Sequence, residues 1–295
     1  MKRKIYLKLM GGLGNQLFQY ACAKNLSIEL NGELIIDDKS GFFFDRIFKR
    51  KFSLPKFFKY KRMHLKEIFL FLIIILLKKL FFYKSFFLKF GNSIIIDETK
   101  LKNYPKSFQN IVSNSQNIFL IGFFQSEKYF FKNKKKILKK IISQKIKNKK
   151  INKFSKTINK NSVLVGIRAF EDAPHGIKKN FGGIESFGFY NKYMMQLKRR
   201  SKLKKFYIFS TFPDLDYLKK KINIKSKIIS KHSNYLGSDL DYLILMSKFK
   251  NFIISNSSFY WWAAYISEMK GDIKIKCSNK FVNFSTVPKR WNLNN

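Results

Sequence analysis

Hydrophobic and polar positions along the chain predict strands that alternate with helices. An apolar run at 5–10 predicts a first strand, and the apolar spacing over 17–28 predicts a helix packed on it. The further predicted strands are 34–37, 94–96, 118–121, 162–167, 206–209, 227–229, 251–254 and 273–275, and the later helices are 189–199, 214–222, 239–247 and 259–268. This order predicts parallel sheets with helices on both faces, and ligands at the carboxyl ends of the strands.

Two segments depart from the alternation. Residues 41–90 are dense in Phe and Lys, and within them 68–77 form an unbroken apolar run, shorter than the ~20 residues of a membrane span. This run has two explanations: a buried helix, or a helix that lies in a membrane interface with its lysines among the headgroups. Residues 132–153 are almost entirely Lys, Ile and Asn, which predicts a solvated basic helix or linker. We therefore expect two domains, 1–155 and 156–295.

The segment GGLGNQ at 11–16 stands between the first predicted strand and the first predicted helix. The N-terminus of a helix presents backbone N–H groups and a positive dipole, and it favours an anion such as phosphate. Gly12 and Gly14 lack side chains that would block close approach, and Asn15 and Gln16 add amide groups. The segment therefore predicts a phosphate site, with a plain turn that binds no ligand as the alternative.

A nicotinamide or flavin site is a further alternative at the same turn. Gly12 and Gly14 match the first two glycines of the dinucleotide fingerprint, and Asp37 follows the next predicted strand. However, Leu17 stands where the third glycine should be. The spacing therefore favours a phosphate site of another kind.

Two predicted strand ends in the second half carry polar groups. Arg168 directly follows one of these strands, and a guanidinium at a strand end offers phosphate a bidentate partner. Asn256, Ser257 and Ser258 follow another strand and precede an aromatic helix, where hydroxyls and N–H groups suit phosphate. The alternatives are a salt bridge from Arg168 to an acid that follows it, and ordinary capping of the helix without a ligand.

The composition adds a strong positive charge. The chain has 60 Lys and Arg against 18 Asp and Glu, a net charge of +42, which suggests a nucleic acid or an anionic membrane as partner. Because Lys, Ile, Asn and Phe are abundant together, codon composition is an alternative explanation. Cys22 and Cys277 are too few for a disulfide framework and lie in no metal-binding pattern. The first residues lack a signal-peptide cleavage site, so we expect a cytosolic protein.

Four ordered segments match the motifs of one family. GGLGNQLFQYA begins at Gly11, and GFFQSEKYF at 122–130 is similar to the motif GYxQSEKYF. VGIRAFED at 165–172 is a partial match to HxRRxD, in which the arginines hold a pyrophosphate. NSSFYWWAA at 256–264 is the most specific match, to NSSFSWWAAxL. Together these segments resemble the α-1,2-fucosyltransferases, glycosyltransferase family 11, over most of the chain.

The resemblance implies a GT-B-like α/β fold of two Rossmann-like domains, with parallel sheets that face a cleft. It implies inverting transfer of L-fucose from GDP-β-L-fucose to the 2-hydroxyl of a galactose-type residue on a surface glycan. Domain 1–155 would be the acceptor side and 156–295 would bind the GDP sugar. The donor-binding residues would be Gly12, Gly14, Asn15, Gln16, Arg168, Asn256, Ser257 and Ser258.

The match to the arginine motif is incomplete. Arg168 matches the first arginine, Ala169 replaces the second, and Gly166 stands at the histidine position. We therefore expect Arg168 alone to hold the pyrophosphate in this motif. The loss of the second arginine predicts donor binding that differs in detail from the family pattern.

The implied reaction needs groups that stabilise the departing pyrophosphate and a base near the acceptor hydroxyl. Arg168 and the two helix starts suit the first task, so we expect no metal and no cofactor. Asp-x-Asp pairs at 214–216 and 239–241 lie at predicted helix starts, which favours dipole pairing over metal ligation; the second pair is also a candidate for binding the nucleobase. The candidate bases are, in order, Asp172, Glu171 and His175, and a dissociative mechanism needs no strong base.

Other functions share some of these features. Another GDP-sugar transferase would use the same phosphate-binding groups, and a nucleotide-dependent oxidoreductase would use the glycine turn. A non-enzymatic nucleic-acid binder would explain the charge but neither that turn nor 256–262, so we expect no nucleic-acid partner. We expect an oligosaccharide or lipid-linked glycan as acceptor, and peripheral contact with the anionic inner face of the cytoplasmic membrane.

Overall fold

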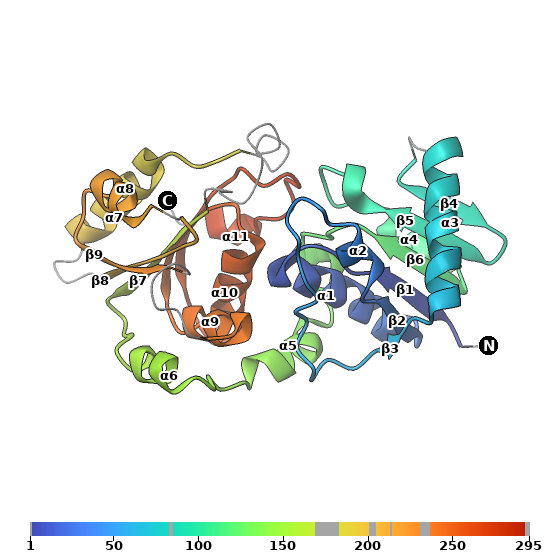
Figure 1. Cartoon of the computed structure of the whole chain (residues 1–295), viewed down its shortest axis with the longest axis horizontal. Helices are drawn as coiled ribbons and strands as arrows, with labels where there is room; N and C mark the ends of the chain where they lie inside the picture. Colours follow the sequence, from blue (N-terminus) through green and yellow to red (C-terminus); the bar gives the residue numbers. More distant parts are fainter. Residues whose placement is uncertain are drawn as a thin grey trace. The chain divides into compact units, whose positions relative to one another are not determined.

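The computed structural model describes residues 2–82, 85–168, 183–200, 205–212, 214–230 and 237–292. The chain divides into two compact units, Met1–Lys140 (unit 1) and Ile141–Asn295 (unit 2) (Figure 1). The division lies before the predicted boundary at 155. The basic segment is largely helical and most of its lysines are exposed, which agrees with the predicted solvated basic helix. It forms two helices, α5 (Lys134–Ile142) and α6 (Lys149–Ser155), which bury Ile137, Leu138, Ile141 and Ile151.

Unit 1 contains a six-stranded sheet in the order β3-β2-β1-β6-β5-β4. All neighbours are parallel except β4 and β5, which form an antiparallel hairpin. The three strands predicted after the first are confirmed as β2, β5 and β6, whereas β3 and β4 were not predicted. The bounds are β1 (Lys4–Lys8), β2 (Glu33–Asp37), β3 (Lys61–Arg62), β4 (Phe87–Phe90), β5 (Ser93–Asp97) and β6 (Asn117–Ile121).

Unit 1 has two long helices, α1 (Leu13–Glu29) and α3 (Leu65–Phe81). It also has the short helices α2 (Ser40–Phe43) and α4 (Phe108–Ser113) and the 3₁₀ turns η1 (Glu98–Lys100) and η2 (Glu127–Tyr129). Helix α1 follows the first strand as predicted. Helix α3 buries Ile68, Phe71 and Ile75 against Tyr6 and Phe119 of the sheet.

Helix α3 contains the apolar run at 68–77, and full burial, one of the two explanations of that run, does not hold. Only one of its faces is buried, and large apolar residues such as Phe69 and Leu80 are mostly exposed on the other. None of the described helices is both long and apolar enough to cross a bilayer.

Unit 2 contains a fully parallel five-stranded sheet in the order β11-β10-β7-β8-β9. Its predicted strands and helices are all confirmed, and the short α11 is an addition. The strands are β7 (Ser162–Ile167), β8 (Lys205–Ser210), β9 (Ser226–Ser230), β10 (Asn251–Ile254) and β11 (Lys274–Cys277). Besides α6, the helices are α7 (Phe187–Arg200), α8 (Leu215–Lys221), α9 (Asp239–Met246), α10 (Ser258–Glu268) and α11 (Lys289–Asn292).

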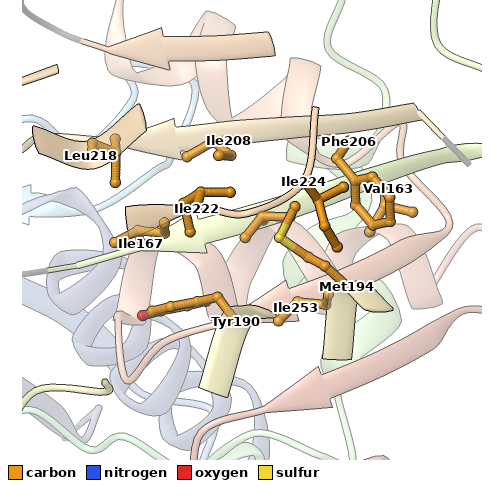
Figure 2. Close-up of a cluster of buried hydrophobic side chains, with 11 residues drawn as sticks. Val163, Ile167, Tyr190, Met194, Phe206, Ile208, Leu218, Ile222, Ile224 and Ile253 are labelled. Carbon is orange, nitrogen blue, oxygen red and sulfur yellow. The ribbon is translucent and has the colours of Figure 1, made fainter. Parts of the chain in front are cut away.

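The core of unit 2 explains why β7 has no polar residue after Ser162. Figure 2 shows Val163 and Ile167 of β7 together with Ile208 of β8, packed against Tyr190 and Met194 of α7. A parallel strand with helices on both sides has no polar face, so its sequence lacks alternation. Burial also raises the pKa of the Tyr190 phenol, which therefore stays neutral at physiological pH.

In each sheet the order in which the chain adds strands reverses beside the first strand. In unit 1 the chain moves outward from β1 to β2 and β3, and β6 occupies the other side of β1. In unit 2 it moves outward from β7 to β8 and β9, and β10 occupies the other side of β7. Ligands of open α/β sheets bind at such switch points, beyond the carboxyl ends of the strands.

Candidate functional site

The glycine turn of unit 1 leads from β1 directly into α1. Gly11 has a φ of +76°, which favours glycine. Gly12 is the N-cap residue of α1 and has an extended backbone. A Cβ added at Gly12 would meet no described atom within 4 Å. The first amides of α1 therefore point out of the helix beside a backbone that a ligand can approach.

Gln16 holds this turn in place. The residue is fully buried, and its Nε2 donates to Gly11 O (2.8 Å) and Lys51 O (2.9 Å). Its Oε1 accepts from Ser53 N at 2.9 Å. The amide that was predicted to contact a ligand thus fastens residues 51–53 to the turn, and we assign Gln16 a positioning role.

The loop after β6 lies beside the glycine turn. Gln19 joins the two, because its Oε1 accepts from Met10 N (3.1 Å) and its Nε2 donates to Gly122 O (3.0 Å). Gln125 of the GFFQSEKYF segment donates from Nε2 to Asn15 Oδ1 at 2.8 Å. The two motifs of the first half therefore meet at the switch point of unit 1.

Ser126 begins a helical turn. Its side chain accepts from Lys128 N, and the turn that follows is the short η2. The segment after Gly122 therefore combines a strand end with a capped helical turn.

Glu98 is a residue of this site that was not predicted. Its carboxylate is buried, and Oε2 accepts from the backbone N–H groups of Phe123 (2.9 Å) and Phe124 (3.0 Å). Gly122 has a φ of +136°, and a Cβ there would lie 2.7 Å from the Glu98 Cβ. The only sequence signal was an acid just beyond an apolar strand, which does not by itself reveal which amides it binds.

Asp37 weakens the dinucleotide alternative. This side chain is buried, and its Oδ1 accepts from Lys39 N (3.0 Å) and Ser40 N (2.9 Å). The Ser40 hydroxyl donates to its other oxygen. A dinucleotide site needs such a carboxylate for the ribose, whereas Asp37 is committed to the start of α2.

The switch point of unit 2 lies between the ends of β7 and β10. Ser255 N donates to Gly166 O at 3.0 Å, so the two strand ends are in direct contact. Arg168 follows β7, and α10 begins at Ser258 with Ser257 as its extended N-cap. A guanidinium and a positive helix end are thus carried by adjacent strands, an arrangement suited to a diphosphate.

Asn256 holds the loop between β10 and α10 in place. It is buried, and its Nδ2 donates to Gly183 O (3.1 Å) and Lys280 O (2.9 Å). Neither Ser257 nor Ser258 is buried, and the Ser257 side chain makes no cap hydrogen bond. We therefore interpret Asn256 as a residue that fixes the loop, and the two serines as the hydroxyl groups available at the helix start.

Gly166 and Tyr260 occupy one space. A Cβ at Gly166 would lie 2.6 Å from the Tyr260 ring, and the Tyr260 hydroxyl donates to Phe209 O at 2.9 Å. The ring thus fills the place beside β7 that a larger side chain at 166 would need. The departure from the family motif at this position has a steric explanation.

The aromatic run of α10 belongs to the core. Trp261 and Trp262 are fully buried, and Trp261 Nε1 donates to Thr286 O at 2.9 Å. Trp261 also stacks on Tyr265 with ring centroids 4.5 Å apart. These residues anchor the helix whose N-terminus forms the site.

The three candidate bases, Asp172, Glu171 and His175, lie outside the described residues, as does Ala169. Asp214 caps α8 by accepting from Tyr217 N at 2.8 Å.

The second Asp pair also lies at a helix start, as predicted. Asp241 accepts from Lys147 N (2.7 Å) and from the hydroxyl of Ser238, which caps α9 (3.0 Å). Among the described residues, no three His, Cys, Asp or Glu side chains come together as metal ligands would.

A chain with two Rossmann-like units is typical of the GT-B-like fold class found among glycosyltransferases. Residues 4–291 match the sequence profile of Glycosyl transferase family 11, and the chain belongs to this family. It is therefore a glycosyltransferase, and the family resemblance of the four motifs is confirmed.

Two relatives from Escherichia coli match along their length. The alpha-1,2-colitosyltransferase is 27% identical over 303 residues, which cover 97% of this chain and 97% of the relative. The O-antigen biosynthesis glycosyltransferase WbnK is 26% identical over 316 residues, which cover 97% and 94%.

A solved structure shares the fold. A mutant of Arabidopsis thaliana FUT1 in complex with GDP matches with a TM-score of 0.51 at 11% identity. The match covers 95% of this chain and 72% of that one.

Proposed function

We propose that this glycosyltransferase moves L-fucose from GDP-β-L-fucose to the 2-hydroxyl of a galactose-type residue on a surface glycan, with inversion. The observation that carries the proposal is the contact between the end of β7, which Arg168 directly follows, and the end of β10, which leads into the N-terminus of α10. The family of the chain and the α-1,2 linkage in the name of its colitosyltransferase relative support the linkage.

The departing diphosphate is the group that unit 2 recognises in this proposal. As the sugar–oxygen bond breaks, negative charge grows on the GDP, and preoriented donors stabilise that charge. Arg168 supplies a full positive charge, while Ser257, Ser258 and the first amides of α10 supply neutral donors. These groups do the work for which other enzymes use a divalent cation, so we propose a reaction that needs no metal.

Unit 1 is proposed to serve the acceptor side, with Gly12, Gly14 and Asn15 offering an anion-compatible surface at its own switch point. The three candidate bases, Asp172, Glu171 and His175, follow Arg168 in the chain. A carboxylate in this segment would take the proton of the acceptor hydroxyl as the new glycosidic bond forms.

A second candidate is transfer of a colitosyl group with the same linkage. One relative at 27% identity over nearly the whole chain carries that name. Both reactions would use the same diphosphate contacts and differ only in the sugar pocket, so the two candidates share the role of Arg168.

The test is GDP release in EDTA from GDP-L-fucose, GDP-colitose and GDP-mannose, each with and without a panel of β-galactosides. We expect release from GDP-L-fucose that depends on the acceptor, and a product with an α-1,2 linkage by NMR. Faster release from GDP-colitose would favour the second candidate. No acceptor-dependent release from any of the three donors would contradict both.

A further inference from the structure

Helix α3 is apolar on two opposite faces. One face, with Ile68, Phe71 and Ile75, packs on the sheet of unit 1. The other face, which we call the outer face, carries large apolar side chains that are 56–71% exposed: Leu65, Phe69, Leu70, Leu76, Leu80 and Phe81. Single exposed apolar residues are ordinary, but a continuous row of them on one helix marks an interaction surface.

The spacing of these residues makes the outer face continuous. Leu65, Phe69, Leu76 and Leu80 follow one another at intervals of four or seven residues, so they share one side of the helix. The 17 residues of α3 extend about 25 Å. The outer face is therefore a long apolar strip along the helix axis, as in a helix that lies flat on a surface.

The charges around the outer face are positive. Lys66 and Lys79 are exposed on α3 itself, and Lys61 and Lys89 are exposed on strands beside its two ends. The single acid of the helix, Glu67, binds back to His64 N at 2.9 Å in the capping box. An apolar surface bordered by lysines complements an apolar layer bordered by anions.

A second copy of the chain would fit this surface less well. Each chain carries a net charge of +42, so association of two copies would bring like charges together. An anionic lipid surface attracts the same charge and also accepts the apolar residues.

We propose that the outer face of α3 inserts into the interface of an anionic membrane, with Lys66 and Lys79 at the headgroups. The helix lies along the membrane and does not cross it, in keeping with its length and with the sheet behind it. This inference is independent of the sugar that the enzyme transfers.

The first experiment is flotation of the full-length chain with vesicles of phosphatidylglycerol and phosphatidylcholine, and with vesicles of phosphatidylcholine alone. We expect binding to the anionic vesicles only. The triple variant Phe69→Ser, Leu76→Ser, Leu80→Ser should bind at least about tenfold more weakly, because each substitution removes several carbon atoms that the membrane would bury. The matched control, Phe131→Ser, Val282→Ser, Phe284→Ser, removes exposed apolar groups elsewhere and should bind as the wild type does.

A second measurement follows insertion directly and needs no loss of function. The three native tryptophans are at most 2% exposed, so a Phe69→Trp variant adds the one indole that lipid can reach. We expect brominated phosphatidylcholine, mixed with phosphatidylglycerol, to quench this indole and to leave the wild type unquenched.

Three results would overturn the inference. They are a wild type that ignores anionic vesicles, a triple variant that binds them as well as the wild type, and a wild-type dimer that the triple variant abolishes. The last result would assign the outer face to a second copy. Circular dichroism of the triple variant checks that α3 still folds.

Discussion

The two units have the same switch-point topology but equip it with different chemistry. In unit 1, amide side chains join the loops after β1 and β6 to each other and to residues 51–53. In unit 2, the ends of β7 and β10 carry Arg168 and the start of α10. The topology sets where a ligand can bind in each unit. The residues at the strand ends set whether that unit would recognise a ligand by its shape or by its charge.

The largest effect should come from Arg168→Ala, which removes the full charge from the site of unit 2. If this guanidinium stabilises the leaving diphosphate, kcat/KM falls roughly 10²- to 10³-fold, with part of the loss recovered in Arg168→Lys. Steady-state GDP release measures the effect. Arg62→Ala, an exposed arginine of unit 1 that pairs with Asp38, is the matched control and should leave kcat/KM unchanged.

The next effect, on stability, belongs to unit 1. Glu98→Ala leaves the half-buried amide of Phe123 and the buried amide of Phe124 without their acceptor, which should cost about 2–4 kcal/mol of unfolding free energy. Urea unfolding followed by circular dichroism measures it.

All three tryptophans lie in unit 2, so their fluorescence should change less than the circular dichroism does in Glu98→Ala. The control is Asp216→Ala, because Asp216 is exposed and forms an exposed ion pair with Lys219, whose ammonium lowers the Asp216 pKa. An unfolding curve for Glu98→Ala that matches the wild type would contradict the role of this carboxylate.

A smaller effect should appear at the contact of Gly166 with Tyr260. Gly166→Ala forces a Cβ against the ring and should cost about 1–3 kcal/mol, while Tyr260→Ser removes the ring and its bond to Phe209 O. In the double variant the clash is gone, so its loss of unfolding free energy should be smaller than the sum of the losses in the two single variants. Strict additivity in urea unfolding would show that the two residues do not compete for space.

The smallest effect is expected for Gln125→Ala, which removes one half-buried hydrogen bond to Asn15 in unit 1. The cost should be about 0.5–1.5 kcal/mol. Because Asn15 stays in place, KM for the donor should change less than in Arg168→Ala. A larger change in KM than for Arg168→Ala would move the recognition of charge from unit 2 to unit 1.

Much of the fold could be predicted because its strands are short apolar runs separated by clear helices. This holds for all of unit 2 except α11, and for β1, β2, β5 and β6 of unit 1. The 41–90 segment was not predicted well, since β3 has only two residues and β4 pairs antiparallel in a chain of otherwise parallel strands. The helix at 68–77 was predicted, but its exposed face could not be told from full burial, because a run with apolar residues on both faces fits either case.

The sequence was enough to predict that Gly12, Arg168 and Ser257 lie at strand ends or helix starts. The candidate site was not predictable where side chains bind distant backbone. Gln16 is paired with residues 51–53, and Glu98 with residues 123–124, and no local pattern announces such contacts. The polar residues that look most suited to a ligand, such as Gln16 and Asp37, serve to hold the loops.

The measurement that tests the central claim most directly is amide hydrogen exchange of the whole chain with and without GDP. Binding of the diphosphate at the switch point of unit 2 should slow exchange in peptides that contain 257–260 and the end of β7 at 166–168. Arg168→Ala should abolish that protection at the same GDP concentration. Protection that is confined to other parts of the chain, or no protection at saturating GDP, would contradict the account.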